Sequence, residues 1–184
     1  MRVPMVAMWM VTGYCYSILR RNSPRDSRSL WRLGPFFGQW RSILGLFLPA
    51  ALLVAAGVYL ATPRLLLDMP KRQPLPWAMV MLLYPVLSVV PQTIIYRAFI
   101  FTRYAPLFPS EPLLILASGL CFSWLHIVLR NPIAPLLTLP AGFLFAWRFS
   151  RTRSIPVSAL EHALYGCLMF TIGLGAYFRT GPAQ

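Results

Sequence analysis

Apolar residues of this chain come in long blocks separated by short polar stretches, without the alternation that marks amphipathic elements. A helix needs ~20 apolar residues to cross the hydrocarbon core of a bilayer. Six blocks meet or approach that length: residues 3–19, 42–61, 77–96, 112–129, 132–149 and 155–176. The pattern predicts an all-α, polytopic membrane bundle of about six transmembrane helices. The first block lacks a small-residue cleavage site, so we expect a retained helix and not a signal peptide.

Proline is frequent within these blocks. Several of the 18 prolines lie in or beside a predicted span: Pro49, Pro85, Pro91, Pro132, Pro135 and Pro140. Each removes a backbone donor and favours a kink, and in a bilayer the freed carbonyl must be satisfied by protein or by a water-filled cavity. We therefore expect kinked or broken helices around an intramembrane polar cavity.

The composition changes this picture little. The chain is 58% hydrophobic and only 11% charged, with a mean hydropathy of +0.62. These values are typical of an integral membrane protein. The net charge of +13 comes from 17 basic residues against four acids. Most arginines lie between the apolar blocks, where they favour lipid headgroups as partners and make nucleic acid the weaker interpretation.

The arginines also predict an orientation. Eleven of them lie in loops 20–41, 97–111 and 148–154, namely Arg20, Arg21, Arg25, Arg28, Arg32, Arg41, Arg97, Arg103, Arg148, Arg151 and Arg153. The positive-inside rule then places these loops in the cytoplasm and both termini outside. The aromatic residues of loop 20–41 are compatible with an interfacial segment or with a solvated basic loop.

Two histidines, the only ones in the chain, stand inside apolar blocks. His126 lies late in block 112–129, and His162 directly follows Glu161, the one acid within a span. An ionisable residue within a membrane segment is by default a functional-site hypothesis, although a histidine there can also serve only as a hydrogen bond between helices.

The depths of the two histidines conflict if all six spans are complete. His126 then lies ~21 Å from the inner surface and His162 only ~10 Å from it, given the rise of a helix. They meet if Arg130 to Leu137 is an irregular segment inside the membrane and the fifth helix covers only about Thr138 to Arg151. We therefore expect an irregular intramembrane segment between the fourth and fifth helices.

Two imidazoles on different helices are able to ligate a divalent metal such as zinc, which activates a bound water for attack on a carbonyl. Hydrolysis also requires a general base, and Glu161 is a candidate, with Arg97 or a metal as its cation. Adjacent helical residues point ~100° apart, however, so Glu161 is equally able to face another helix. For Arg97 the alternative is a side chain that snorkels at a helix end.

Three polar clusters interrupt the spans in a fixed order. They are Gln92-Thr93-x-x-x-Arg97, Phe122-x-x-x-His126 and His162-x-x-x-Gly166. Their order and spacing resemble the CPBP family of intramembrane metalloproteases, which includes the type II CAAX prenyl endopeptidases and the Abi-like bacteriocin-processing or immunity proteins. The family pattern is EExxxR, FxxxH and HxxxN on successive membrane helices. The resemblance divides the chain into N-terminal helices with a basic loop (1–76), a CPBP-like core (77–178) and a short tail (179–184).

The resemblance implies a membrane-embedded peptidase site in which a glutamate activates water, while histidines and an asparagine bind metal or stabilise the oxyanion. His126, His162 and Arg97 match the family pattern, the two histidines being the expected metal ligands. Gln92 and Thr93 replace the glutamate pair, and Gly166 replaces the asparagine. Neither Gln nor Thr is able to act as a carboxylate base, and the loss of a general base costs ~10²–10⁴-fold in rate. Asn131 is a candidate for the missing amide.

We therefore expect an integral protein of the bacterial inner membrane that acts as a metal-dependent endopeptidase, impaired in its first motif. Its expected substrates are membrane-embedded or lipidated peptides, prenylated ones included. The alternatives are a catalytically inactive scaffold or immunity protein that binds a similar peptide, and a small proton-coupled transporter that depends on Glu161.

Overall fold

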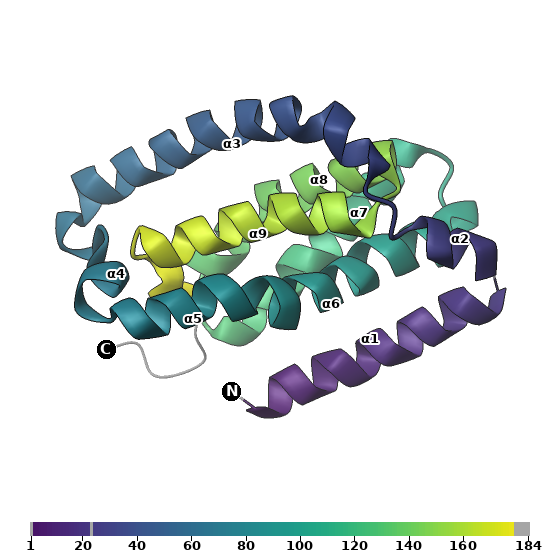
Figure 1. The fold of residues 1–184 in the computed structure, drawn as a ribbon, viewed down its shortest axis with the longest axis horizontal. Helices are drawn as coiled ribbons and strands as arrows, with labels where there is room; N and C mark the ends of the chain where they lie inside the picture. Colours follow the sequence, from purple (N-terminus) through teal and green to yellow (C-terminus); the bar gives the residue numbers. More distant parts are fainter. Residues whose placement is uncertain (1, 23, 179–184) are drawn as a thin grey trace.

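The computed structural model describes residues 2–22 and 24–178, so the predicted tail lies outside the described residues. Within those two ranges every regular element is a helix, as predicted (Figure 1). The elements are α1 (Arg2–Asn22), α2 (Pro24–Ser29), α3 (Gly34–Ala61), η1 (Pro63–Leu65), α4 (Asp68–Arg72), α5 (Pro74–Tyr84), η2 (Pro85–Val89), α6 (Val90–Thr93), η3 (Ile94–Tyr104), η4 (Ala105–Leu107), α7 (Glu111–Leu125), η5 (His126–Leu129), α8 (Ile133–Thr152), α9 (Ile155–Thr171) and η6 (Leu174–Phe178).

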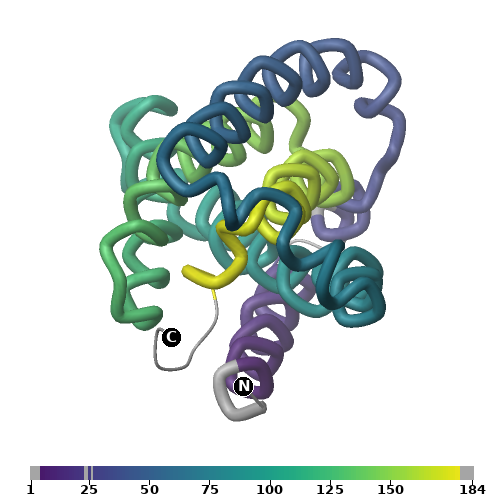
Figure 2. The backbone as a smooth tube through the Cα atoms, turned by 90° about the vertical axis from the view of Figure 1, so that its left-hand side faces the viewer, coloured from purple at the N-terminus to yellow at the C-terminus, as the bar shows by residue number. Residues whose placement is uncertain are grey.

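Helix α9 forms the centre of the bundle. It packs against α3, α5, α6 and α8, and Figure 2, an end-on view, shows it in the middle of the bundle. Its first half is buried, including Val157, Ser158 and His162. Glu161 and His162, two of the predicted site residues, therefore lie inside the protein.

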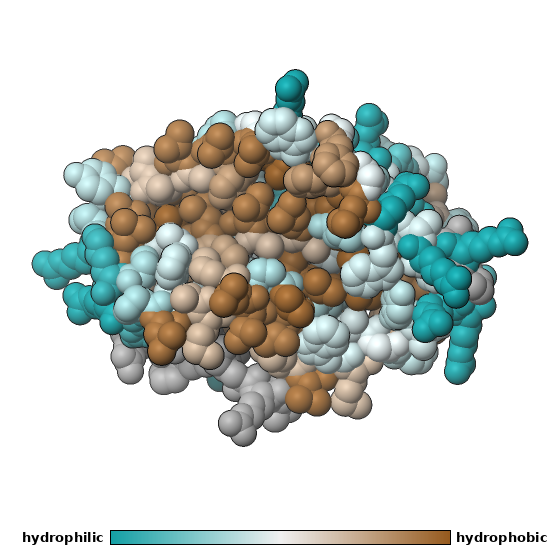
Figure 3. Space-filling model, viewed as in Figure 1, coloured by the Kyte–Doolittle hydropathy of each residue, from teal (hydrophilic) through white to brown (hydrophobic). Residues whose placement is uncertain are grey.

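The surface of the bundle is that of an integral membrane protein. In Figure 3 a broad apolar band crosses the middle of the molecule, and hydrophilic side chains gather at its two ends. Four helical stretches of the described chain are long and apolar enough to span a membrane: Gly34–Ala61, Pro74–Leu107, Glu111–Leu129 and Ile133–Thr152. The predicted blocks 3–19 and 155–176 correspond to α1 and α9, which lie outside this set.

The second of these stretches is longer than the sequence pattern predicts. We expected it to end at residue 96, but the helix continues from Pro74 to Leu107 through two π-helical segments, η2 and η3. Pro85 opens the first of them. Because proline lacks a backbone N–H, the wider π turn accommodates it without breaking the helix.

The structure corrects the interpretation of two arginines. Arg97 lies within η3 and Arg148 within α8, and both side chains are fully buried. Neither belongs to a cytoplasmic loop, so neither acts as a topology signal. The alternative of a snorkelling Arg97 is likewise wrong, because a snorkelling side chain keeps its charged head in water.

The break after α7 is shorter than predicted. The described chain leaves α7 at Leu125, makes one 3₁₀ segment and enters α8 already at Ile133, so the fifth helix does not begin at Thr138. Asn131 stabilises this start: its Oδ1 accepts from the N–H of Ala134 at 2.9 Å, and its Nδ2 donates to the carbonyl of Tyr177 at 2.9 Å. Asn131 therefore supports the backbone and is not the missing amide of the motif.

The start of α9 lies in the interior of the protein. The N–H of Ile155 donates to the carbonyl of Leu30 at 2.7 Å, and Ser154 Oγ donates to the carbonyl of Arg32 at 2.7 Å. Ser154 and Ile155 are fully buried. Because residues 30–32 cover its first turn, α9 begins inside the protein, and His162, seven residues later, is buried.

Candidate functional site

The side chain of Phe122 links the two histidines. Its buried ring has its centroid 4.8 Å from that of His126 and 5.2 Å from that of His162. The rings contact it edge to face. The structure thus brings His126 and His162, from different helices, to one aromatic residue of the second motif.

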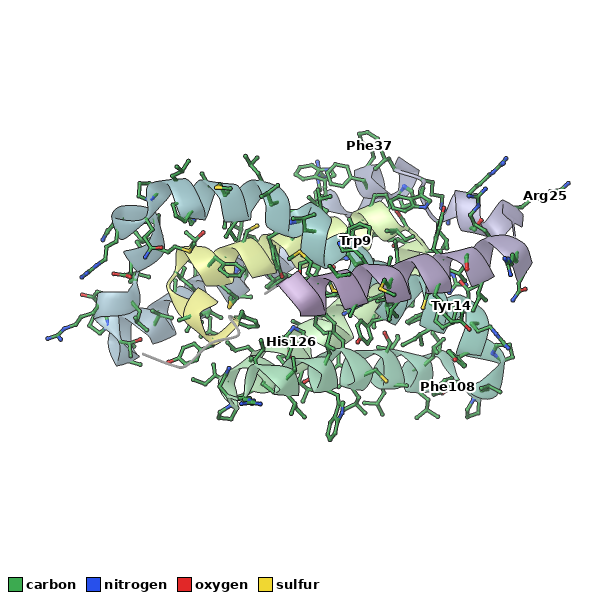
Figure 4. All side chains as sticks on the ribbon, turned by 90° about the horizontal axis from the view of Figure 1, so that it is seen from below. Trp9, Tyr14, Arg25, Phe37, Phe108 and His126 are labelled. Atoms are coloured by element: carbon green, nitrogen blue, oxygen red, sulfur yellow. The ribbon has the colours of Figure 1, made fainter. Side chains whose placement is uncertain are left out.

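His126 follows the last residue of α7. Its Nδ1 lies 2.8 Å from the carbonyl oxygen of Phe122. A carbonyl oxygen only accepts, so Nδ1 carries the proton of a neutral ring and Nε2 keeps a free lone pair. Figure 4 shows His126 on the underside of the bundle, in the region of α1 and α7, where it lines a cavity.

His162 is enclosed. Its ring stacks on Phe145 at a centroid distance of 4.6 Å, and its Nε2 lies 3.4 Å from the Tyr84 hydroxyl. Its Nδ1 is buried without a hydrogen-bond partner among the described residues. His162 therefore meets the cavity only through Tyr84, which lines it.

Arg97 lies on the same two aromatic rings. Its Cζ is 4.1 Å from the ring centroid of Phe122 and 5.6 Å from that of Phe145. All three of its guanidinium nitrogens are buried and have no hydrogen-bond partner in the described part of the chain. The cation–π contacts offset a part of the cost of this burial.

The residues at the family's glutamate positions do not neutralise Arg97. Thr93 Oγ1 donates to the carbonyl of Val89 at 2.8 Å. Gln92 Nε2 donates to Ser88 Oγ at 2.7 Å, while Gln92 Oε1 is buried without a described partner. The first motif therefore supplies amide and hydroxyl groups where the family has carboxylates.

Glu161 is engaged elsewhere. Arg148 donates to both carboxylate oxygens, from Nε to Oε2 and from Nη2 to Oε1, each at 2.9 Å, and both side chains are completely buried. Arg148 also donates to Gln39 and Ser42 of α3. The carboxylate thus joins α9 to α8 and α3, and its cation is Arg148 and not Arg97. The angle of ~100° between neighbouring helical residues explains why Glu161 and His162 face different neighbours.

Gly166, at the family's asparagine position, faces Tyr84. A Cβ built on Gly166 would overlap the ring and hydroxyl of Tyr84, closer than van der Waals contact permits. The phenol of Tyr84 therefore fills the space into which a side chain at position 166 would point.

A cavity of about 770 Å³ opens beside this group. Its walls are mostly Met, Leu, Val and Ile side chains from α1, α5, η5 and α9. Polar groups come mainly from Tyr84, Gln92, Tyr96 and His126. The size lies within the ~300–1,000 Å³ that is typical of ligand pockets.

These residues do not fit the expected divalent metal. A catalytic zinc takes three protein ligands, and nowhere in the described chain do three His, Cys, Asp or Glu residues form a group able to hold a metal. The buried guanidinium of Arg97 also packs on Phe122, the ring that contacts both histidines, and its positive charge would repel a dication there. Below, the roles in the reaction are therefore assigned to side chains of the protein and not to a metal.

The sequence interpretation missed two residues of this region. Tyr84 carries no signal beyond its position before Pro85, because its role depends on contact with Gly166, 82 positions later. Arg148 did carry a signal: it stands within an apolar block, where a charged residue is normally paired.

The three clusters lie within a segment that a known family describes. Residues 74–168, more than half of the 184-residue chain, match the sequence model of the type II CAAX prenyl endopeptidase Rce1-like family. No curated protein and no solved structure matches the chain. The matched segment includes Gln92, Arg97, His126, His162 and Gly166, all placed on helices of an integral membrane bundle. The chain therefore belongs to the type II CAAX prenyl endopeptidase Rce1-like family.

Proposed function

We propose that this protein is an intramembrane endopeptidase that cleaves membrane-associated, lipid-modified peptides, with His126 as the general base. The observation that carries the proposal is the orientation of the His126 ring at the cavity wall. The hydrogen bond from Nδ1 to the Phe122 carbonyl leaves Nε2 as the free acceptor of a neutral imidazole.

A free imidazole nitrogen is suited to take a proton from water. The His126 side chain is part-buried and borders the cavity, so a water molecule there has access to Nε2. A fixed tautomer removes the need to reorient the ring during the reaction. Among the described residues that line the cavity, none carries a carboxylate. We therefore expect a reaction rate below that of a site with a well-placed second acid or base, which contributes ~10²–10⁴-fold.

The cavity favours a substrate with a long apolar chain. Its lining is chiefly aliphatic and rich in methionine, a flexible side chain that adapts to irregular apolar ligands. The polar residues Tyr84, Gln92 and His126 provide sites for a peptide bond beside that chain. A prenylated peptide combines both features, and prenylated peptides are the substrates that the family description names.

The test uses purified protein in lipid nanodiscs with a fluorogenic peptide that carries a farnesylated cysteine. We expect slow cleavage of this peptide and no cleavage of its unprenylated form. His126→Ala abolishes cleavage. Trp124→Phe, a lipid-facing change on the same helix, leaves it intact, because Trp124 is 74% exposed.

Two results would contradict the proposal. Cleavage that survives His126→Ala excludes His126 as the base. Binding of the prenylated peptide without any cleavage by the wild-type protein supports the inactive, peptide-binding relative instead.

A further inference from the structure

We infer that Tyr84 is a catalytic residue of this site: its phenolic hydroxyl binds the carbonyl oxygen of the scissile peptide bond, and His162 orients that hydroxyl. The inference rests on the proposed peptidase function. Tyr84 belongs to none of the three motifs. Its hydroxyl occupies the space that the missing side chain of Gly166 leaves open.

The first step of the argument is spatial. Position 166 lies four residues after His162 and one turn along the same face of α9. A side chain there would occupy the volume that the Tyr84 ring and hydroxyl fill. Tyr84 and Gly166 both border the cavity that His126 lines. Because Gly166 has no side chain, the hydroxyl of Tyr84 is able to enter this space from α5 as a hydrogen-bond donor.

The second step concerns the proton on His162. Nδ1 is buried without a described partner, and the positive charge of Arg97, which packs on the same rings of Phe122 and Phe145, acts on this imidazole. An N–H at Nδ1 would be both unsatisfied and repelled by the guanidinium, whereas a lone pair there is attracted to it. The proton of the neutral ring therefore resides on Nε2.

The third step follows from this tautomer. Nε2–H donates to the oxygen of Tyr84, 3.4 Å away, a distance at the long end of a hydrogen bond. Because that oxygen already accepts from His162, its own O–H is free to point into the cavity. His162 is thus a positioning residue, and Tyr84 presents the donor.

The reaction balances with these groups. Water gives a proton to Nε2 of His126 while its oxygen bonds to the carbonyl carbon, and the π electron pair of the carbonyl moves to oxygen. Tyr84 O–H donates a hydrogen bond to that oxyanion and keeps its proton. As the C–N bond breaks, the leaving nitrogen takes the proton from His126, giving an amine and a carboxylic acid. Loss of one such donor costs ~10²–10³-fold in kcat.

The kinetic test compares Tyr84→Phe with Tyr59→Phe, a matched change on the exposed face of α3, where Tyr59 is 61% exposed. Tyr84→Phe keeps the ring against Gly166 and removes only the hydroxyl. We expect kcat to fall by ~10²-fold with KM unchanged. A modest loss of thermal stability accompanies it, because Nε2–H of His162 loses its acceptor. Tyr59→Phe should behave as wild type. If the wild type is active and Tyr84→Phe has the same kcat, the inference about Tyr84 is wrong and the proposed function stands. If the wild type is inactive, both the inference and the proposed function are wrong.

A spectroscopic test does not depend on activity. The chain has two histidines, so ¹⁵N-histidine labelling gives two ring systems, which His126→Ala assigns. We expect His162 to show a protonated Nε2 and an unprotonated Nδ1, and its Nε2 resonance to shift in Tyr84→Phe and not in Tyr59→Phe. A protonated Nδ1, or an Nε2 resonance that ignores Tyr84→Phe, overturns the inference.

Position 166 supplies the reciprocal test. Gly166→Asn alone should destabilise the protein and abolish cleavage, because its side chain meets Tyr84. Combined with Tyr84→Ala, the same asparagine should restore cleavage above the level of Tyr84→Ala alone. Failure of the combined variant to exceed Tyr84→Ala, with both folded, contradicts the idea that the phenol takes the place of a side chain at 166.

Discussion

Breaking the buried pair between Glu161 and Arg148 should destabilise the protein strongly without removing a catalytic group. Glu161→Leu removes two hydrogen bonds of 2.9 Å from the buried guanidinium of Arg148. Among the described residues this leaves Gln39 and Ser42 as its acceptors. Removal of one partner from a buried ion pair costs about 3–5 kcal/mol. The same loss is expected for Arg148→Met, which leaves the carboxylate alone.

The double variant should recover most of that loss. Replacement of a buried ion pair by apolar residues of similar volume is often neutral or stabilising. We therefore expect Glu161→Leu with Arg148→Met to lie within about 1–2 kcal/mol of wild type, the range of volume-conserving core changes. The double-mutant cycle of these two positions should then give a coupling free energy of several kcal/mol, far above that of independent sites.

The exposed pair of Asp68 and Arg72 provides a matched control. Its Oδ1–Nε distance is 2.7 Å, but the two side chains are 40% and 80% exposed, respectively. Such a pair is worth only about 0.3–0.5 kcal/mol. Asp68→Ala should therefore leave the unfolding midpoint nearly unchanged.

The assay is reversible unfolding in mixed micelles of rising SDS fraction, followed by the fluorescence of the six tryptophans, with peptide cleavage measured on the folded fraction. The reasoning is refuted if Glu161→Leu is as stable as wild type. It is also refuted if the folded double variant has lost cleavage, because the Glu161 carboxylate would then act in the reaction.

Three further predictions concern other parts of the site and the bundle. Gly142→Ala should lower the free energy of unfolding by about 1–3 kcal/mol in the same assay, because its Cβ would lie 2.9 Å from the backbone oxygen of Gly119, where α8 contacts α7. A stable variant would show that the two helices are able to separate there. Thr93→Glu should raise cleavage by up to about 10²-fold, since a carboxylate four residues before Arg97 supplies both a base and a counter-charge. The control is Thr93→Gln. An equal gain in both variants would argue against a role of the charge. Dialysis against EDTA should leave cleavage unchanged, because no three His, Cys, Asp or Glu residues of the described chain form a group able to hold a metal. Activity lost to EDTA and restored by zinc would refute this.

Much of the fold follows from local pattern. Long apolar runs must satisfy their backbone groups within one segment, so they form helices whatever their neighbours are. The break near Pro132 was also predicted, since proline and its preceding residue disfavour helix locally. The limits of these elements were less predictable. The helix of Arg97 continues to Leu107 through two π-helical segments, the first of which accommodates Pro85, and no count of apolar residues reveals this.

The sequence by itself determined that this is an all-helical membrane protein with His126 and His162 inside apolar segments, because residue type and spacing are sufficient for those conclusions. Only the tertiary structure decided the partner of each polar group. Glu161 pairs with Arg148, Asn131 holds the start of α8, and Tyr84 stands against Gly166. These contacts join residues on different segments, and they depend on the rotation and depth of each helix. A rotation of ~100° per residue separates Glu161 from its neighbour His162, so packing, and not spacing along the chain, determines which side chains share the site.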